Sequence, residues 1–352
     1  MNYYFKLIFT SLKIGVAFNL FTLFLIASYT LLIEYYFRPS QPLSNPRIEF
    51  GTAVSGGRIF STADPKNHSF RPAWAKIESQ FDLFIPEFQL RADWKQASPR
   101  LEKWCKTRNC CAHRIGFSDR RIPSFRCFTL DDWFLTNRDF LGSQYHSSVV
   151  LNLDSFFHKL PRGSRVIINE PYVLFANRQS FKDFTAWFLD LVSRHPGLTF
   201  EIGLQVHLQW IDLYWRDYHG WLIPALGEFG RLHRIKWGIT EFSIYDRVWK
   251  SRLAYGGANP ARMRLIDRFE SIIPDRFRRA VVAHQAYIFH RDAFRAGATH
   301  FVQWGNFPAT WFVAEIDSEY KSTFALYDWE GNPQLMYGAI VRGLADAKKL
   351  KS

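Results

Sequence analysis

Short apolar runs alternate with amphipathic helical stretches along most of the chain, but the first apolar run is different. Residues 14–33 are 20 positions without a charge, enough for a helix that crosses roughly 30 Å of hydrocarbon. Lys6 and Lys13 precede this run, and the aromatic residues 35–37 follow it like an interfacial belt. The pattern predicts a single-pass membrane anchor at 14–33, a cytoplasmic tail at 1–13 and an extracytoplasmic domain beyond.

A cleaved signal peptide is the alternative interpretation of this run. Its apolar core is usually about 7 to 15 residues long and is followed by an A-x-A-like cleavage site. The run is longer than that and no such site follows, so the anchor is favoured. Residues 34–47 are rich in Pro and Ser and are expected to form a linker, followed by a domain at 48–346 and a basic tail at 347–352.

The domain shows seven strand-like runs with helical stretches between them. The strand-like runs are "IEFGTAV", "FDLFIPEF", "CCAHRIGF", "RVIINEP", "LTFEIGLQVHL", "IKWGITEFSI" and "THFVQWG". The helical stretches include "FKDFTAWFLDLVSRH" and "PARMRLIDRFESII". Repeated βα alternation predicts a parallel α/β fold, and a (β/α)₈ TIM barrel fits a domain of this length. No Gly-rich phosphate loop follows these runs, which disfavours a nucleotide-binding fold.

A barrel of this type needs eight strands, one more than the pattern shows. The shortfall falls between Pro171 and Gln205, where the fifth and sixth βα units look merged into "LTFEIGLQVHL". Either one βα unit is shortened there, or one strand escapes the pattern.

Two carboxylates stand where predicted strands end. Glu170 follows "RVII" and Glu241 follows "IKWGIT". In a parallel barrel the carboxyl ends of all strands meet at one rim, where catalytic groups lie. Two carboxylates across one cleft are the minimum needed to cleave a glycosidic bond, because one protonates the leaving oxygen while the other attacks or activates water.

Several segments, in order, resemble family 10 of the glycoside hydrolases, the xylanase family. "FDLFIPEFQLRADW" is similar to F-x-x-x-T-P-E-N-x-M-K-W, "AHRIGFS" to R-G-H-T-L-V-W-H, and "VIINEP" to W-D-V-V-N-E. "GLQVHL" is similar to G-x-Q-x-H, "GITEFSI" to I-T-E-L-D-I, and "FVQWGNFPATW" to F-W-G-x-x-D-x-x-x-W. "LYDWEGNPQLMYGAI" is similar to the closing D-x-x-x-x-P-K-P-A-Y-x-A. The resemblance covers about residues 50–345.

The resemblance implies a retaining glycosidase that cuts a polysaccharide internally, with its acid/base on strand four and its nucleophile on strand seven. Glu170 would be the acid/base and Glu241 the nucleophile, with their carboxyl groups roughly 5–5.5 Å apart. The other residues that the resemblance places at the sugar are Glu87, Arg91, His113, Asn169, Gln205, His207, Trp304 and Trp311. Carboxamides and imidazoles fix hydroxyl groups, and indole faces stack on sugars.

Departures from the family fall on positions that read the sugar. Phe88 stands where the family has Asn, and Phe117 stands where it has Trp. The Asp of the last tryptophan motif is absent, and Arg91 replaces Lys. The planar guanidinium suits carboxylate or sulfate groups. The substrate is therefore expected to differ from plain xylan.

The net positive charge of the chain also indicates a substrate other than plain xylan. The formal net charge is +13, from Lys and Arg spread along the chain, which favours an anionic partner such as an acidic exported polysaccharide. The predicted span and the lack of a recognised motif disfavour nucleic acid. A polysaccharide-binding or assembly protein on the same barrel is the rival interpretation: the altered sugar-reading positions favour it, and the retention of both Glu170 and Glu241 opposes it.

The four cysteines lie within residues 105–127 and suit two local disulfides, whose three possible connectivities the sequence leaves open. A zinc site is disfavoured because no C-x-x-C spacing occurs. His284, His290 and His300 lack ligand spacing such as H-E-x-x-H, so neither a metal nor another cofactor is expected.

Overall fold

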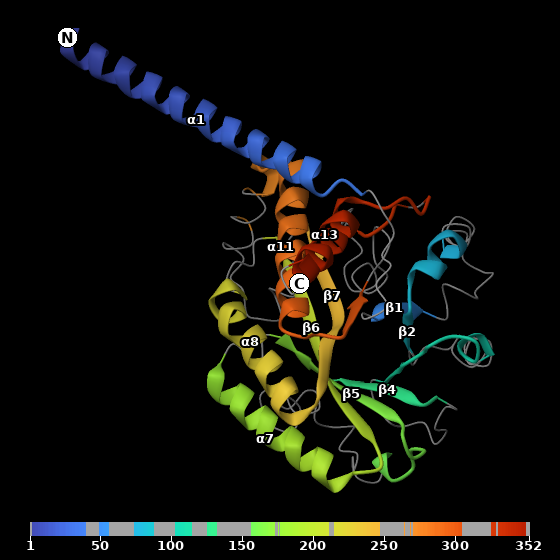
Figure 1. Ribbon diagram of the computed structural model, residues 1–352. Coiled ribbons are helices and arrows are strands. Elements are labelled where there is room, and N and C mark those ends of the chain that lie inside the picture. Colours follow the sequence, from blue (N-terminus) through green and yellow to red (C-terminus); the bar gives the residue numbers. More distant parts are fainter. Residues whose placement is uncertain are drawn as a thin grey trace.

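Eight parallel strands close into a barrel in the computed structural model, each paired with the next along the chain, and β8 pairs with β1 (Figure 1). The strands are β1 (Glu49–Ser55), β2 (Leu83–Glu87), β3 (Ala112–Arg114), β4 (Cys127–Asp131), β5 (Arg165–Pro171), β6 (Thr199–Gln209), β7 (Lys236–Tyr245) and β8 (His300–Gln303). The structure describes residues 2–39, 49–55, 74–87, 103–114, 125–131, 156–172, 175, 177–210, 215–246, 264, 268, 270–304, 325–328 and 330–349. The predicted (β/α)₈ class is confirmed.

Helices cover the outside of the strands, among them α7 (Arg178–Arg194), α8 (Trp215–His233), α11 (Asp275–Arg295) and α13 (Leu335–Lys349). The structure also has the short η1 (Glu78–Gln80) and the long α1 (Asn2–Tyr36), which extends away from the barrel (Figure 1). The helix α7 shows why helices cover the strands: its buried residues Phe184, Phe188 and Leu191 recur at helical spacing. Asn177 caps its first turn by accepting a hydrogen bond from the Gln179 backbone N–H at 2.8 Å.

Side chains along β5 alternate between the inside of the barrel and the helix layer, as the two-residue period of a strand requires. Ile167 packs inside the barrel with Leu83, Ile85 and Cys111. Its neighbours on either side, at positions 166 and 168, belong to the larger apolar cluster that joins the strands to the helices. Both faces are buried, which is why the run reads as continuously apolar.

The strand absent from the sequence pattern is β4, which lies before Glu170. Between β5 and β6 the structure has the helix α7 and no merged unit. Glu170 therefore lies on the fifth strand of this barrel, whereas the resemblance implied the fourth, and that expectation was wrong. The cause is local: "CFTLD" is only five residues long, with a cysteine, a threonine and an aspartate among them, so its apolar signal is weak.

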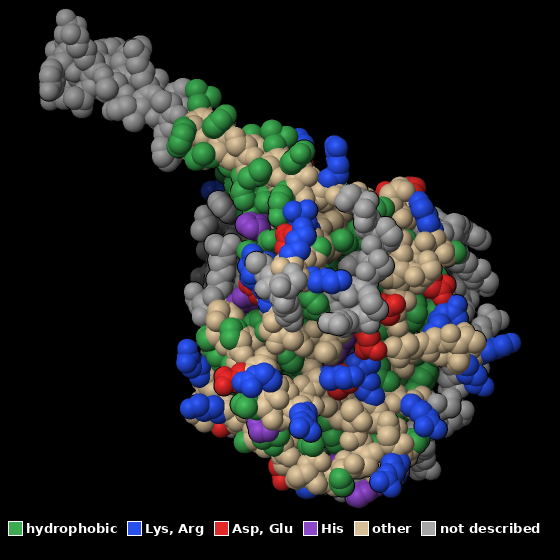
Figure 2. Space-filling model, in the orientation of Figure 1, with side chains coloured by type: hydrophobic (Ala, Val, Ile, Leu, Met, Phe, Trp, Pro, Cys, Tyr) green, Lys and Arg blue, Asp and Glu red, His purple; other side chains and the backbone are tan. Residues whose placement is uncertain are grey.

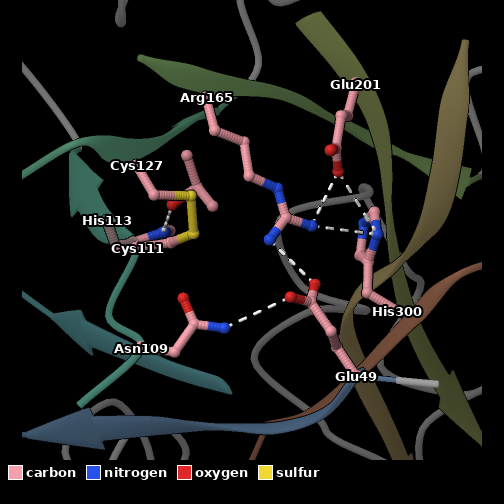
Figure 3. The surroundings of a disulfide bond; sticks show 9 residues. Glu49, Asn109, Cys111, His113, Cys127, Arg165, Glu201 and His300 are labelled. Atoms are coloured by element: carbon pink, nitrogen blue, oxygen red, sulfur yellow. Dashed lines mark hydrogen bonds and ion pairs between the residues drawn. A yellow bond between two sulfur atoms is a disulfide. The ribbon is translucent and has the colours of Figure 1, made fainter. Parts of the chain in front are cut away.

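A cluster of charged side chains fills the amino-terminal end of the barrel (Figure 3). Arg165 forms ion pairs with Glu201 at 2.7 Å and with Glu49 at 2.8 Å, and Asn109 donates to Glu49 at 3.2 Å. Burial alone lowers the pKa of Arg165, but the two carboxylates outweigh it and the pKa is raised. His300 is buried beside this arginine, and burial together with the arginine charge holds its pKa well below the usual value.

Two disulfides pair the four cysteines. Cys105 bonds Cys110, five residues away, and Cys111 bonds Cys127, sixteen residues away. The second bond lies inside the barrel and joins the start of β3 to the start of β4, as Figure 3 shows. The expected disulfides are thus present, and the connectivity that the sequence left open is settled.

His290 on α11 predicts a pH dependence of stability. Its ring is buried between Phe242 and Phe301, and burial lowers its pKa from 6.5 to about 4. The unfolded chain binds the proton first as pH falls, so folding stability drops between pH 6.5 and pH 4, by about 1.4 kcal/mol per pH unit for one such group. His290→Leu should remove that much from the slope of the unfolding free energy against pH, measured by urea titration. An unchanged slope would contradict the assignment.

The helix α1 contains one segment, Asn19–Tyr36, that is long and apolar enough to cross a membrane. Most side chains of this segment are exposed, but the last two turns of α1 pack on α11 and α13. The helix α13 continues to Lys349, so residues 347–349, expected in a tail, are helical.

Candidate active site

Glu241 and Asn169 meet near the carboxyl ends of β7 and β5. The Asn169 amide Nδ2 donates to Glu241 Oε1 at 2.7 Å. The Thr240 hydroxyl donates to the amide oxygen of the same Asn169. Because the hydroxyl proton occupies the amide oxygen, the amide NH₂ is the group that faces the carboxylate. The asparagine is therefore fixed in the orientation in which it donates to Glu241.

His207 on β6 holds the other oxygen of the same carboxylate. Its Nε2 lies 2.9 Å from Glu241 Oε2, and its Nδ1 lies 2.7 Å from the Ser243 hydroxyl. Gln205, two residues earlier on β6, donates to the Asn169 backbone carbonyl at 3.2 Å. Both carboxylate oxygens thus have a nitrogen partner on a rigid strand, and Glu241 is held in one orientation.

A β-bulge in β7 aims Glu241 at this network. The register with β6 passes from Leu204 opposite Ile239 to Gln205 opposite Glu241, so Thr240 has no partner of its own. Two consecutive residues, Thr240 and Glu241, therefore both reach Asn169. Bulges re-aim side chains in this way and are frequent beside active sites.

Gly203 makes room for the bulge. A Cβ at this position would lie 2.6 Å from the Thr240 hydroxyl and 2.9 Å from Ile167 Cγ2. Gly203→Ala should displace Thr240, and with it the Asn169 amide, at a cost of about 1–3 kcal/mol in unfolding free energy. Gly220→Ala on α8 is the matched control, since nothing lies within 4 Å of its Cβ position. Urea unfolding should therefore show a loss for the first variant and none for the second; equal stabilities would contradict the packing argument.

Trp304 lies beneath the two imidazoles. Its ring centroid is 5.1 Å from that of His113 and 6.4 Å from that of His207. Trp304 is buried and packs in the barrel interior with the Cys111 disulfide. The Thr129 hydroxyl lies 3.1 Å from His113 Nδ1. The indole thus forms an apolar floor under the polar network.

Glu170 lies next to Asn169 on β5, opposite Leu204, and its side chain is fully buried. Strand alternation places it on the other face of β5 from Asn169. Since Asn169 faces Glu241, the two carboxylates leave their strands on different faces. Glu241, Asn169, His207 and Gln205 form one contact network with Trp304 below it, and Glu170 adjoins this network as the chain neighbour of Asn169.

Three of the expected site residues fall partly or wholly outside the structure's described part. Arg91 and Trp311 lie outside the described residues. Glu87 ends β2 and lies opposite His113 on the neighbouring strand β3, but its side chain is outside the described part.

Three residues of the network were missed in the sequence: Thr129, Thr240 and Ser243. The two-residue period of a strand signals Ser243, which lies on the same face as Glu241. No comparable signal exists for Thr240, because a bulge cannot be recognised in an apolar run. Thr129 was missed along with its strand. Across the described residues, no group of three or more His, Cys, Asp and Glu side chains could hold a metal ion.

Comparison with known proteins gives matches in structure and none in sequence. No family model and no curated protein matches the chain. Xylanase 10B from Thermotoga petrophila, in complex with xylobiose, aligns with a TM-score of 0.53 at 14% identity over 88% of this chain and 99% of that one. The chain has a xylanase-like fold. Xylanase 10B from Thermotoga maritima aligns with a TM-score of 0.51 at 14% identity, over 87% of this chain and 96% of that one. A thermostable mutant of a xylanase from Cellvibrio japonicus aligns with a TM-score of 0.53 at 12% identity, over 85% of this chain and 98% of that one.

Proposed function

We propose that the protein is a retaining endo-glycoside hydrolase that acts on an exported polysaccharide. The observation that carries the proposal is the Glu241 carboxylate, held through both oxygens by Asn169 and His207 above the Trp304 ring. A carboxylate fixed in this way is prepared for attack on an anomeric carbon, because it loses little freedom on reaching the transition state. The xylanase-like fold supports the same chemistry.

In this mechanism a Glu241 oxygen forms a bond to the anomeric carbon while the glycosidic C–O bond breaks. Glu170 gives its proton to the leaving oxygen, and the sugar remains as an ester of Glu241. Water then displaces Glu241, with Glu170 taking the water proton, so the configuration at the anomeric carbon is retained. His113, Asn169, Gln205 and Trp304 would position the sugar, together with Glu87, Arg91 and Trp311.

The full burial of Glu170 means that its carboxyl group must become accessible when substrate binds. A carboxyl spacing of roughly 5–5.5 Å in a substrate complex is expected for retention.

The proposal includes a membrane anchor that holds this chemistry outside the cytoplasm. The apolar segment of α1, the basic residues that precede it and the paired cysteines support a single-pass protein with its barrel in an oxidising compartment. The charge of +13 and Arg91 support an acidic polymer as substrate.

The test is a hydrolysis panel. Full-length protein in detergent is incubated with neutral xylan and with uronic and sulfated polysaccharides at matched ionic strength, and new reducing ends and their anomeric form are followed by NMR. Internal cleavage of an acidic polymer with retained configuration is expected. Equal cleavage of neutral xylan would contradict the acidic substrate, and inverted product would contradict the retaining mechanism.

The burial of Glu170 also favours a second candidate, a polysaccharide-binding or assembly protein on the same barrel. A proton donor that stays closed off from substrate cannot assist the leaving group. This candidate predicts that polysaccharide binds but no member of the panel is cut.

A further inference from the structure

The end of α1 is packed against the barrel through polar and apolar contacts together. The Tyr29 hydroxyl lies 2.8 Å from His284 Nδ1, and Glu34 pairs with Arg276. Ile33 and Phe37 are buried. Since this part of α1 is attached to α11 and α13 by side chains as well as by the linker, the direction of α1 fixes the direction of the barrel.

That direction follows from which residues meet. The Tyr29 ring lies 5.6 Å from Phe277 in the first turn of α11, whereas the Phe37 ring lies 5.1 Å from Tyr287, three turns later. Going back along α1 toward its amino end therefore leads past the beginning of α11. The helix α11 ends at Arg295, and β8 begins at His300, so the beginning of α11 lies at the carboxyl end of the strands. The apolar part of α1 thus extends beyond the barrel rim that carries the candidate site (Figure 1).

The length of the apolar run adds a second constraint. Residues 14–33 would cover roughly 30 Å as a helix, about the thickness of the hydrocarbon layer. Its last five residues, 29–33, are within the segment packed against the barrel. The part before them, residues 14–28, covers only roughly 22 Å. The packed segment must therefore lie close to the lipid for the run to span the layer.

The surface at this point is apolar. Near the end of α1, three large side chains are exposed: Leu31, Leu32 and Tyr35. Ile272, four residues before Arg276, is 76% exposed. Among the described residues outside α1, the other large apolar side chain that is exposed is Leu232, at the end of α8. Arg38, Arg264 and Arg268 are exposed nearby in sequence. In Figure 2 apolar side chains follow α1 down to its base, where Lys and Arg side chains gather.

We propose that the barrel is seated on the lipid bilayer by a membrane edge formed by Leu31, Leu32, Tyr35 and Ile272, with its carboxyl rim on the membrane side. The apolar side chains enter the interface, and the arginines contact anionic headgroups. The seating rests on the anchor proposed above. If the proposed hydrolase activity holds as well, the site faces the membrane surface, and its substrate is a polysaccharide segment held close to the lipid.

The experiment uses the full chain in liposomes of phosphatidylcholine and phosphatidylglycerol. A fluorophore is attached to a cysteine introduced at one of three positions: Phe24→Cys within the span, Ile272→Cys in the membrane edge, and Leu232→Cys as the matched control. Leu232 is also apolar and exposed, but it lies just before β7 begins, at the amino end of the strands. Lipids with a nitroxide near the headgroup, and in a second preparation along the acyl chain, then report which labels lie at the membrane surface or within the hydrocarbon layer.

Loss of emission at Phe24 and Ile272, with a blue shift at both and neither change at Leu232, supports the seating. Loss at Phe24 alone overturns the seating and leaves the anchor standing, whereas no loss at Phe24 overturns the anchor. Loss at Leu232 in place of Ile272 reverses the proposed direction. Arg268→Cys provides a second position near the edge if Ile272→Cys fails to fold, and none of these readouts depends on catalysis.

Discussion

Glu241→Gln should abolish hydrolysis while leaving the barrel folded and polysaccharide still bound. The amide cannot form the ester intermediate, although it is nearly the same shape and can still meet Asn169 and His207. Loss of a nucleophile of this kind lowers kcat by roughly 10⁴- to 10⁶-fold. The measurement is the release of reducing ends from whichever polymer the wild-type protein cuts. Binding of the same polymer by affinity electrophoresis checks that the loss is catalytic.

Two further measurements separate a nucleophile from a merely structural carboxylate. Glu228→Gln, exposed on α8, is the matched control and should keep wild-type activity. Glu241→Ala leaves space for azide, a small external nucleophile, and should regain turnover with azide to give a glycosyl azide of inverted configuration. Glu170→Ala with azide should give the retained configuration, because the ester on Glu241 still forms. If the Glu241→Gln variant hydrolyses the polymer at the wild-type rate, the proposed mechanism is contradicted.

Glu201→Gln should cause the largest loss of stability. Glu201 is almost fully buried and pairs with Arg165 at 2.7 Å, so the neutral amide leaves the guanidinium without one of its two carboxylates. Breaking a buried pair by removing one charge costs about 3–5 kcal/mol, and the remaining Glu49 contact places this variant at the lower end, about 3 kcal/mol. Urea unfolding of the full chain in detergent measures the difference.

Glu49→Gln is its matched control. The substitution is the same and the partner is the same Arg165, but the Glu49 side chain is 37% exposed. Water screens that pair, so the loss should be about 0–1 kcal/mol. If the two variants lose equal stability, burial is not what gives the cluster its strength.

Much of the fold could be predicted from the sequence because seven strands are apolar runs. These strands are buried on one face inside the barrel and on the other under the helices. The run before Glu170 and the runs around His207 and Glu241 correspond to β5, β6 and β7 within a residue or two. The remaining strand, β4, could not be predicted from an apolar run. The disulfide between Cys127 and Cys111 helps to hold β4 in the barrel, so a long apolar run is not needed there.

The candidate site was predictable in its residue types more than in its geometry. Motif similarity singled out Glu241, Asn169 and His207, which the structure brings into direct contact. The bulge at Thr240 depends on the register between β6 and β7. Register is a property of neighbouring strands that are far apart in the chain, so a single run of letters does not contain it.

The disulfide inside the barrel has a practical consequence for production of the protein. Cys111 and Cys127 are shielded from solvent by the closed strands, so the bond must form before or while the barrel closes. A chain made in a reducing cytosol would fold without this crosslink. Recombinant protein should therefore be routed through the periplasm or an oxidising host strain, and thiol reagents kept out of the early purification buffers.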